Sequence, residues 1–290
     1  MQLVLGCIIS FAGMGYVMRT PDGATWNPGD TLPDALGALL SPRPGAAVCW
    51  LGNDGWLIGW RGALIAFDLD LRSRSRLWPS PLSEAQIGPH LRALFITHEH
   101  GDHFNAATAK ALIRESRCRF VIPQSCLARA RSIGLPPARI VIARPGEPFG
   151  LEGVRVRPLR AIHGDRGTAV YRHANLDDCG YVLSLGRLRV AQLGDSVLTQ
   201  EHLSLRSIDV LFVSPTEHNL AVLPAKRLLQ AIRPRHVFPQ HYGTYRPTAQ
   251  NRFWTVGYVK ELREALTEPL RSRFQTLRPG EVCEIRRAAR

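Results

Sequence analysis

Apolar residues fall in short runs that are separated by glycine, proline and polar residues, which is the pattern of short strands joined by turns. Residues 47–71 predict strands that are broken by tight turns, and Asn53-Asp54-Gly55 within them is a hairpin signal. The same texture predicts further strands at 91–97, 119–123, 139–143, 154–159, 181–195 (a pair), 208–215, 236–241 and 281–285.

Segments with helical spacing lie between these strands. Residues 105–116 predict a helix for which Asn105 is a suitable N-cap. The other expected helices are 125–134, which would end at Gly134, 223–234 and 258–268. Because strands and helices alternate in both halves of the chain, we expect an α/β fold with two sheets inside and helices outside.

The first 44 residues differ from the rest. Residues 1–18 are apolar, and the segment from Pro21 to Pro44 reads as an irregular lead-in, so we expect one domain over residues 45–290. The apolar segment has three interpretations, which are a membrane anchor, a helix packed on the domain, or a start assigned too early. If it spans a membrane, Arg19 and the basic body would keep the C-terminal side in the cytoplasm.

The formal net charge of +13 favours anionic partners or a solvated basic surface. The arginines are scattered, so nucleic-acid binding has no support beyond the charge, and a small anionic substrate is the expected partner. The six cysteines form no C-x-x-C pair, and reduced thiols in a cytoplasmic protein are expected. The oligomeric state cannot be read from the sequence.

The segment Thr97-His98-Glu99-His100-Gly101-Asp102-His103-Phe104 follows a buried strand directly and concentrates ligand-type side chains. Residues two apart on a strand point the same way, and Gly101 permits a tight turn after them. Imidazole and carboxylate together suit Zn²⁺, Mn²⁺ or Fe better than Ca²⁺ or Mg²⁺. This motif therefore predicts a metal site.

This H-x-H-x-D-H motif resembles that of the metallo-β-lactamase superfamily. Three later segments match its remaining motifs, "PLRAIHGD", "VAQLGDS" and "FPQHYGTY". Together with "CWLGNDGWLI" they are similar to the branch that contains L-ascorbate 6-phosphate lactonase. The resemblance implies an αββα four-layer sandwich with metals at one edge. His163 departs from the lactonase pattern and matches the wider superfamily, which implies a complete ligand set.

The resemblance also implies a ligand for each position of a two-metal centre. One ion would be held by His98, His100 and His163, the other by Asp102, His103 and His241, with Asp195 between them. Zinc is the expected metal and manganese the alternative. Two such ions lower the pKa of a shared water, and the resulting hydroxide would attack a carbonyl carbon or a phosphorus.

Other residues are candidates for supporting roles. Asp102 could also orient the nucleophile, and His218 and Tyr242 could act on the substrate or donate a proton. Glu99 should point away from the ligands, because alternate residues face opposite sides. Thr97 and Asp165 are candidate partners of the ligands. Arg172 and His173 could bind an anionic group, and Cys179 should be packed rather than reactive.

These features predict a metal-dependent hydrolase of a lactone, ester or phosphoester of a small anionic metabolite. One alternative is a nucleic-acid phosphodiesterase on the same fold, although no appended nucleic-acid-handling domain is recognisable. Another is a phospholipase D-like enzyme held at a membrane by residues 1–18. A metal-binding regulatory protein without turnover is the non-enzymatic alternative.

Overall fold

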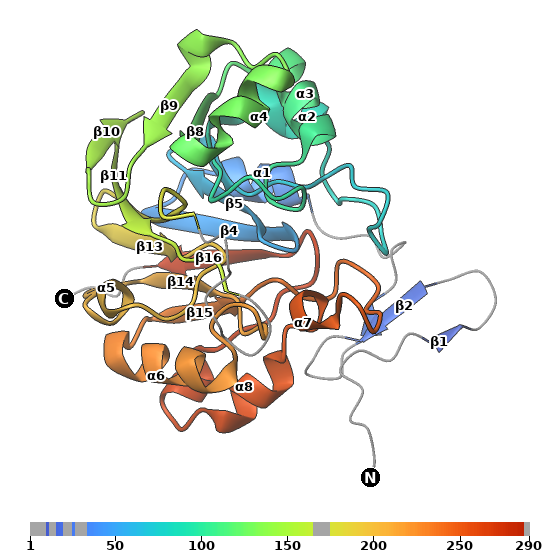
Figure 1. Cartoon of the computed structure of the whole chain (residues 1–290), viewed down its shortest axis with the longest axis vertical. Helices are drawn as coiled ribbons and strands as arrows, with labels where there is room; N and C mark the ends of the chain where they lie inside the picture. Colours follow the sequence, from blue (N-terminus) through green and yellow to red (C-terminus); the bar gives the residue numbers. More distant parts are fainter. Residues whose placement is uncertain (1–9, 12–15, 20–24, 27–33, 165–174, 287–290) are drawn as a thin grey trace.

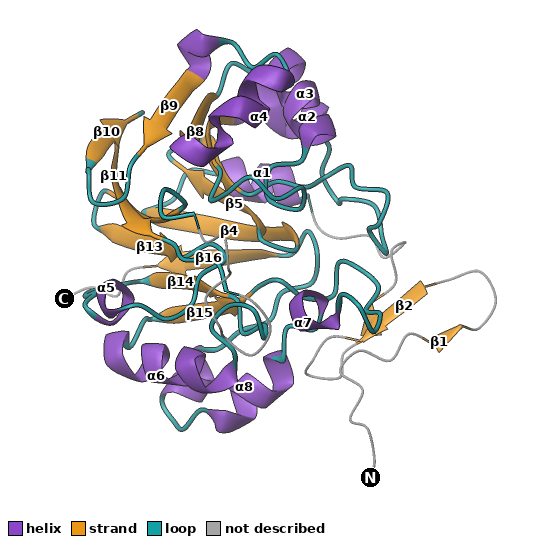
Figure 2. Ribbon diagram, viewed as in Figure 1, coloured by secondary structure: helices purple, strands orange, loops and turns teal. Residues whose placement is uncertain are grey.

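The computed structural model describes residues 10–11, 16–19, 25–26, 34–164 and 175–286. Two sheets face each other, and helices cover the outer face of each, so the expected four-layer α/β sandwich is confirmed (Figures 1 and 2). The seven-stranded sheet has the order β16-β4-β5-β6-β7-β8-β9, and the six-stranded sheet has the order β10-β11-β12-β13-β14-β15.

Each strand of the seven-stranded sheet matches an apolar run of the sequence. Its strands are β4 (Gly45–Gly52), β5 (Gly55–Trp60), β6 (Ala63–Phe67), β7 (Leu91–Phe95), β8 (Arg119–Pro123), β9 (Ile140–Ala143) and β16 (Val282–Arg286). β6 to β9 run parallel, whereas β4, β5 and β16 add antiparallel pairs. The closing strand at the C-terminal end thus joins the sheet built by the first half of the domain.

The second sheet contains β10 (Phe149–Leu151), β11 (Val154–Arg160), β12 (Cys179–Leu185), β13 (Leu188–Gln192), β14 (Val210–Val213) and β15 (His236–Pro239). β10 to β13 are antiparallel, and β13 to β15 are parallel. The predicted strand pair over 181–195 is the β12–β13 hairpin, which turns at Gly186 with a φ of 62°. The parallel strands of both sheets end at the same edge of the sandwich.

The helices form the two outer layers. They are α1 (Ala35–Leu40), α2 (Glu84–Ile87), α3 (Ala106–Glu115), α4 (Leu127–Ser132), α5 (Gln200–Leu203), α6 (Val222–Ile232), α7 (Arg252–Thr255), α8 (Val259–Ala265) and α9 (Leu270–Arg273), with short 3-10 helices Gly88–His90, Gln124–Cys126 and Pro137–Arg139. Asn105 caps α3 as predicted, since its Oδ1 accepts from Thr108 N at 2.9 Å.

Alternation along the strands builds two cores. In β4, Val48 and Trp50 face the core between the sheets, whereas Cys49 and Leu51 face the core under the first helices. Both faces of the central strands are buried, which explains why they read as continuous apolar runs. Cys179 is fully buried and burial raises its pKa to about 12, so its prediction as a packed thiol is confirmed.

The N-terminal region differs from its prediction. Residues 35–40 form α1 instead of irregular chain, because Asp34 Oδ1 accepts from Gly37 N and Leu39 is buried against the sheet. Within the apolar segment, the described residues Ser10–Phe11 (β1) and Tyr16–Arg19 (β2) are paired strands, and β2 also pairs with β3 (Thr25–Trp26). No helix among the described residues is long and apolar enough to cross a membrane.

A buried polar network joins the two sheets beneath their shared edge. Gln240 Oε1 accepts from Trp56 Nε1 and from Gln192 Nε2, at 2.9 Å each. Gln240 Nε2 donates to Gln192 Oε1 at 2.7 Å and to Ser214 Oγ at 3.0 Å. The side-chain amide of Gln240 thus accepts two hydrogen bonds and donates two. The network fixes the ends of the strands against each other.

We predict that Gln240→Leu lowers the free energy of unfolding by roughly 2–5 kcal/mol, because it leaves the Trp56 and Gln192 donors buried without partners. Urea unfolding at pH 7 measures the change. Gln230→Leu makes the same chemical change on the exposed face of α6 and should alter stability by less than about 0.5 kcal/mol. Equal effects of the two variants would contradict a structural role of the network.

A pH-dependent contribution to stability comes from His202 in α5. Burial lowers its pKa from 6.5 to about 4. The unfolded chain therefore binds a proton that the folded chain does not, and this contribution is present above pH 6.5 and is lost as the pH falls toward 4. His202→Gln keeps the capping box with Thr199 but cannot titrate. We expect the difference in free energy of unfolding between the wild-type protein and this variant to shrink between pH 7 and pH 5. Urea unfolding at both pH values measures it, and a difference that stays the same would refute this.

Candidate metal centre

The residues predicted as metal ligands gather at the edge where the parallel strands end. His98, His100, Asp102 and His103 follow β7, whereas His163 follows β11, Asp195 follows β13 and His241 follows β15. The β4–β5 turn reaches the same edge and adds Asp54. Segments up to nearly two thirds of the chain apart thus place their side chains around one point.

The donor atoms form two separate groups and a third that overlaps both. The first group is His98, His100 and His163, the second is Asp54, His103, Asp195 and His241, and the third is His163, Asp195 and His218. Within each group all ligand atoms lie within 4.8 Å of one another. The grouping of the histidines agrees with the prediction, and their role as ligands stays a prediction.

Asp195 Oδ2 lies between the two groups. It is 3.4 Å from Nε2 of His163 in the first group and 3.3 Å from Nε2 of His241 in the second. His103 Nε2 is 3.6 Å from the same oxygen. This placement suits the predicted bridging role of Asp195.

Asp102 borders the second group. Its Oδ2 is 3.6 Å from His103 Nε2 and 3.7 Å from His241 Nε2, and Asn53 Nδ2 donates to it at 3.1 Å. The second group therefore has three carboxylates within reach, whereas the first has three imidazoles and shares Asp195.

The partners of the ring nitrogens fix the histidine tautomers. Thr97 Oγ1 donates to Asp68 Oδ2 at 2.7 Å, so its contact of 3.0 Å with His98 must be a bond that His98 Nδ1 donates. The Nδ1 atom of His103 likewise donates to Asp68 Oδ2 at 3.0 Å, and that of His163 donates to the Gly164 carbonyl at 2.7 Å. When these rings are neutral, as metal binding requires, the lone pair of each is on Nε2.

Thr97 therefore occupies the supporting position predicted for it. Asp68, which follows β6, was missed because its only signal was an acidic residue after an apolar strand. Its carboxylate also accepts from Thr97 N at 2.8 Å, and it is fully buried. Asp165, Arg172 and His173 lie outside the described residues.

His218 lies beside the bridging carboxylate. Its Nε2 is 2.8 Å from Asp195 Oδ2, and Asn219 Nδ2 donates to Asp195 Oδ1 at 2.8 Å. Burial lowers the pKa of His218, and its Nδ1 is 3.3 Å from the Phe253 carbonyl, so acceptor atoms face both ring nitrogens. His218 also belongs with His163 and Asp195 to a group that could hold a metal ion, so its contact with Asp195 suits either a hydrogen bond to that carboxylate or a shared cation.

Two other candidates lie apart from the donor groups. Tyr242 is buried and stacks on Trp50 with ring centroids 4.7 Å apart and an interplanar angle of 15°. Among the described residues it does not line the cavity of the site, so the structure does not bring it to the reacting position. Glu99 is exposed, in agreement with the prediction that it points away from the ligands.

The two groups differ in electrostatics. Burial lowers the pKa of His98, and it lowers that of His100 to about 4 with help from His163, so both rings are neutral at pH 7. In the second group burial opposes protonation of His241, but neighbouring carboxylates, Asp195 first, raise its pKa to about 9. Burial raises the pKa of Asp54 to about 7. The second group thus concentrates buried carboxylates that a cation would stabilise.

A cavity of about 340 Å³ opens above the donor groups. It is lined by His100, Gly101, Asp102, His163, Gly164, Asp195, His218, His241, Phe253 and Trp254. Phe253 and Trp254, from α7, lie edge-on to His218 and His241 and form an apolar wall. Its size is at the lower end of the range for small-molecule sites.

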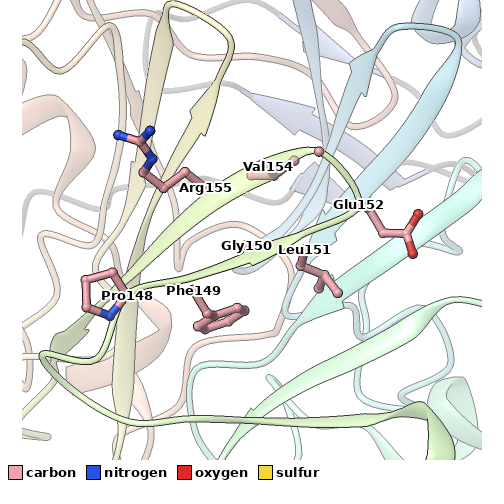
Figure 3. A pocket seen from close by; sticks show the side chains of 8 residues that line it. Pro148, Phe149, Gly150, Leu151, Glu152, Val154 and Arg155 are labelled. Carbon is pink, nitrogen blue, oxygen red and sulfur yellow. The ribbon is translucent and has the colours of Figure 1, made fainter.

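A second hollow, of about 650 Å³, lies at the β10–β11 hairpin. Figure 3 shows the side chains of Phe149, Leu151 and Val154 along it, with Glu152 and Arg155 at opposite ends. Its described lining brings no two titratable side chains together, so it offers no comparable chemistry.

Asp54 was missed as a site residue. The sequence interpretation as a hairpin turn is confirmed, but Asn53 adopts a φ of 48° and the turn directs Asp54 inward to full burial. The Asn53 carbonyl accepts from His241 N at 3.1 Å and from Trp50 Nε1 at 2.9 Å. A turn residue is ordinarily exposed, and the sequence contains no signal that this turn is covered.

Comparisons with known proteins agree with this arrangement. The profile of the family described as "Beta-lactamase superfamily domain" matches residues 66–242. A UPF0173 protein of Pyrococcus furiosus is 30% identical over 228 residues, which cover 74% of this chain and 96% of the relative. A UPF0173 metal-dependent hydrolase of Thermofilum pendens is 27% identical, covering 76% and 95%.

Among solved structures, Igni18, a metallo hydrolase from Ignicoccus hospitalis, has the same fold. Its TM-score is 0.61 at 19% identity, and the match covers 84% of this chain and 99% of that one. At this identity the likeness establishes the fold alone.

We predict that Asp68→Asn weakens metal binding at the second group by about 10- to 100-fold, because an amide does not hold the His103 tautomer as a carboxylate does. Isothermal titration with Zn²⁺ measures this. Asp209→Asn is the matched control, since Asp209 is a buried carboxylate that contacts Arg189 and Arg235 instead of the site. Unchanged titration of the Asp68 variant would show that His103 is oriented without it.

Proposed function

Because the chain belongs to the beta-lactamase superfamily, we propose that this metal-dependent hydrolase cleaves a small ester or lactone in the cavity above the donor groups. The observation that carries the proposal is that histidine ring nitrogens from separate segments of the chain gather around the Asp195 carboxylate in closely spaced donor groups. Nε2 of His98, His103 and His241 are buried without a hydrogen-bond partner among the described residues. Buried polar atoms are otherwise paired, so this donor set fits a cation.

The donor chemistry suits two divalent ions, with zinc expected and manganese the alternative. When bound, such ions supply Lewis acidity and lower the pKa of a nearby water. The residues of the chain then have distinct tasks. Thr97, Asp68 and the Gly164 carbonyl orient the rings, and Asp195 joins the two groups. We assign to His218, which lies beside the cavity 2.8 Å from Asp195 Oδ2, the task of positioning that carboxylate or of giving a proton to the leaving group.

The cavity supports a small substrate with an apolar part. Phe253 and Trp254 offer the only aromatic wall among its described lining residues, and none of those residues is lysine or arginine. Arg172 and His173, which lie outside the described residues, are the candidates that the sequence offers for an anionic group on the substrate. We favour an ester or lactone because the apolar wall of Phe253 and Trp254 suits an uncharged group.

The alternatives have weaker support. The nuclease alternative is supported by the net charge of +13 alone. The alternative of a membrane-bound phospholipase is supported only by the apolar residues 1–18, most of which lie outside the described residues. Neither has a specific observation at the cavity in its favour.

We predict that His98→Ala combined with His100→Ala abolishes hydrolysis and lowers metal uptake, because two of three donors of the first group are lost. Plasma mass spectrometry after dialysis against Zn²⁺ or Mn²⁺ measures uptake, and turnover is measured on the substrate found by screening lactones, acyl esters and phosphodiesters. His90→Ala, which changes a histidine outside the donor groups, is the control. Unchanged metal uptake in the double variant would refute the assignment of His98 and His100 as metal ligands. If the wild-type protein turns over phosphodiesters but no lactone or ester, the nuclease alternative is favoured.

A further inference from the structure

The two donor groups differ in chemistry, and Asp54 is the cause of the largest difference. We propose that Asp54 is a ligand of the second metal position and makes that position more receptive to Mn²⁺ than the three-histidine position. This inference rests on the proposed function, because it concerns the same centre, and it adds a ligand outside the seven that the sequence motifs supplied.

The position of the Asp54 carboxylate is the first argument. The residue is fully buried, and its Oδ2 has no hydrogen-bond partner among the described residues. That oxygen is 3.6 Å from His241 Nε2 and 3.9 Å from His103 Nε2. Ser214 Oγ donates to the other oxygen, Oδ1, at 3.2 Å. One oxygen is therefore held by the fold while the other is aimed into the donor group.

The rigidity of the turn is the second argument. Asn53 N donates to Thr244 Oγ1 at 2.5 Å, and the Asn53 carbonyl accepts from Trp50 Nε1 and from His241 N. The loop that carries His241 and the turn that carries Asp54 are thus joined by backbone bonds. A hairpin turn does not require a buried carboxylate, and burying one without a cation is costly. The cost is offset if the carboxylate binds a metal ion.

The contrast between the positions is the third argument. The first position offers three imidazoles and shares Asp195, and imidazole suits Zn²⁺. The second position offers the carboxylates of Asp54 and Asp195 with two imidazoles, and Asp102 Oδ2 lies within 3.7 Å of both rings. Carboxylate oxygen suits Mn²⁺, so adding Asp54 shifts the second position toward that ion.

The test uses the full chain loaded with one equivalent of Zn²⁺ and then titrated with Mn²⁺, with free Mn²⁺ measured by electron paramagnetic resonance. We expect the wild-type protein to bind one Mn²⁺, and Asp54→Asn to bind it at least about tenfold more weakly. Uptake of the first Zn²⁺ equivalent should be the same in both proteins. Asp209→Asn, another buried carboxylate, should titrate like the wild-type protein. Superimposable Mn²⁺ isotherms of Asp54→Asn and wild type would overturn the proposal.

A second measurement needs no variant, in case Asp54→Asn does not fold. Anomalous diffraction at the manganese edge from wild-type crystals soaked in Mn²⁺ should place an ion within bonding distance of Asp54 Oδ2. An ion bound by His103, Asp195 and His241 with Asp54 beyond bonding distance would refute it. If the wild-type protein binds neither metal, the proposed function is overturned as well. If turnover depends on metal but Asp54→Asn binds Mn²⁺ like the wild-type protein, only this inference is overturned.

Discussion

The shared oxygen of Asp195 is the point on which the site depends. It lies within 3.6 Å of ring nitrogens from His103, His163 and His241, which belong to three separate segments of the chain. Burial would raise the pKa of this carboxyl, but the histidines around it hold its pKa well below the usual range. An ionised carboxylate at this depth requires cationic neighbours, and the fold supplies positions for them on both sides.

The sandwich holds those segments in register through polar contacts rather than apolar packing alone. The network of Gln192, Gln240 and Trp56 joins the two sheets directly below the donor groups, and Ser214 extends it to Asp54. His241 itself has a φ of 62°, a conformation that its neighbours must enforce. Its backbone bond to the Asn53 carbonyl ties this conformation to the turn that presents Asp54. The same turn thus holds the backbone of His241 and presents Asp54, the proposed ligand.

A separate apolar layer borders the donor groups. Phe253 and Trp254 lie edge-on to His218 and His241, so that the apolar wall and the histidines are neighbours. In the proposed function this wall would limit which substrates approach the donor groups. The basic character of the whole chain is not concentrated on the described lining of this cavity.

The sequence by itself determined the element types and the motif that follows β7, because apolar periodicity and ligand spacing are local properties. The strands predicted over 91–97 and 236–241, found over Leu91–Phe95 and His236–Pro239, and the helix capped by Asn105 follow from that local order. Only the tertiary structure decided what Asp54 and Asp68 do, and that Tyr242 packs on Trp50 instead of facing the cavity. These outcomes depend on which turn is covered by a segment nearly two hundred residues away, as in the contact of Asn53 with Thr244, and no local pattern encodes such a contact.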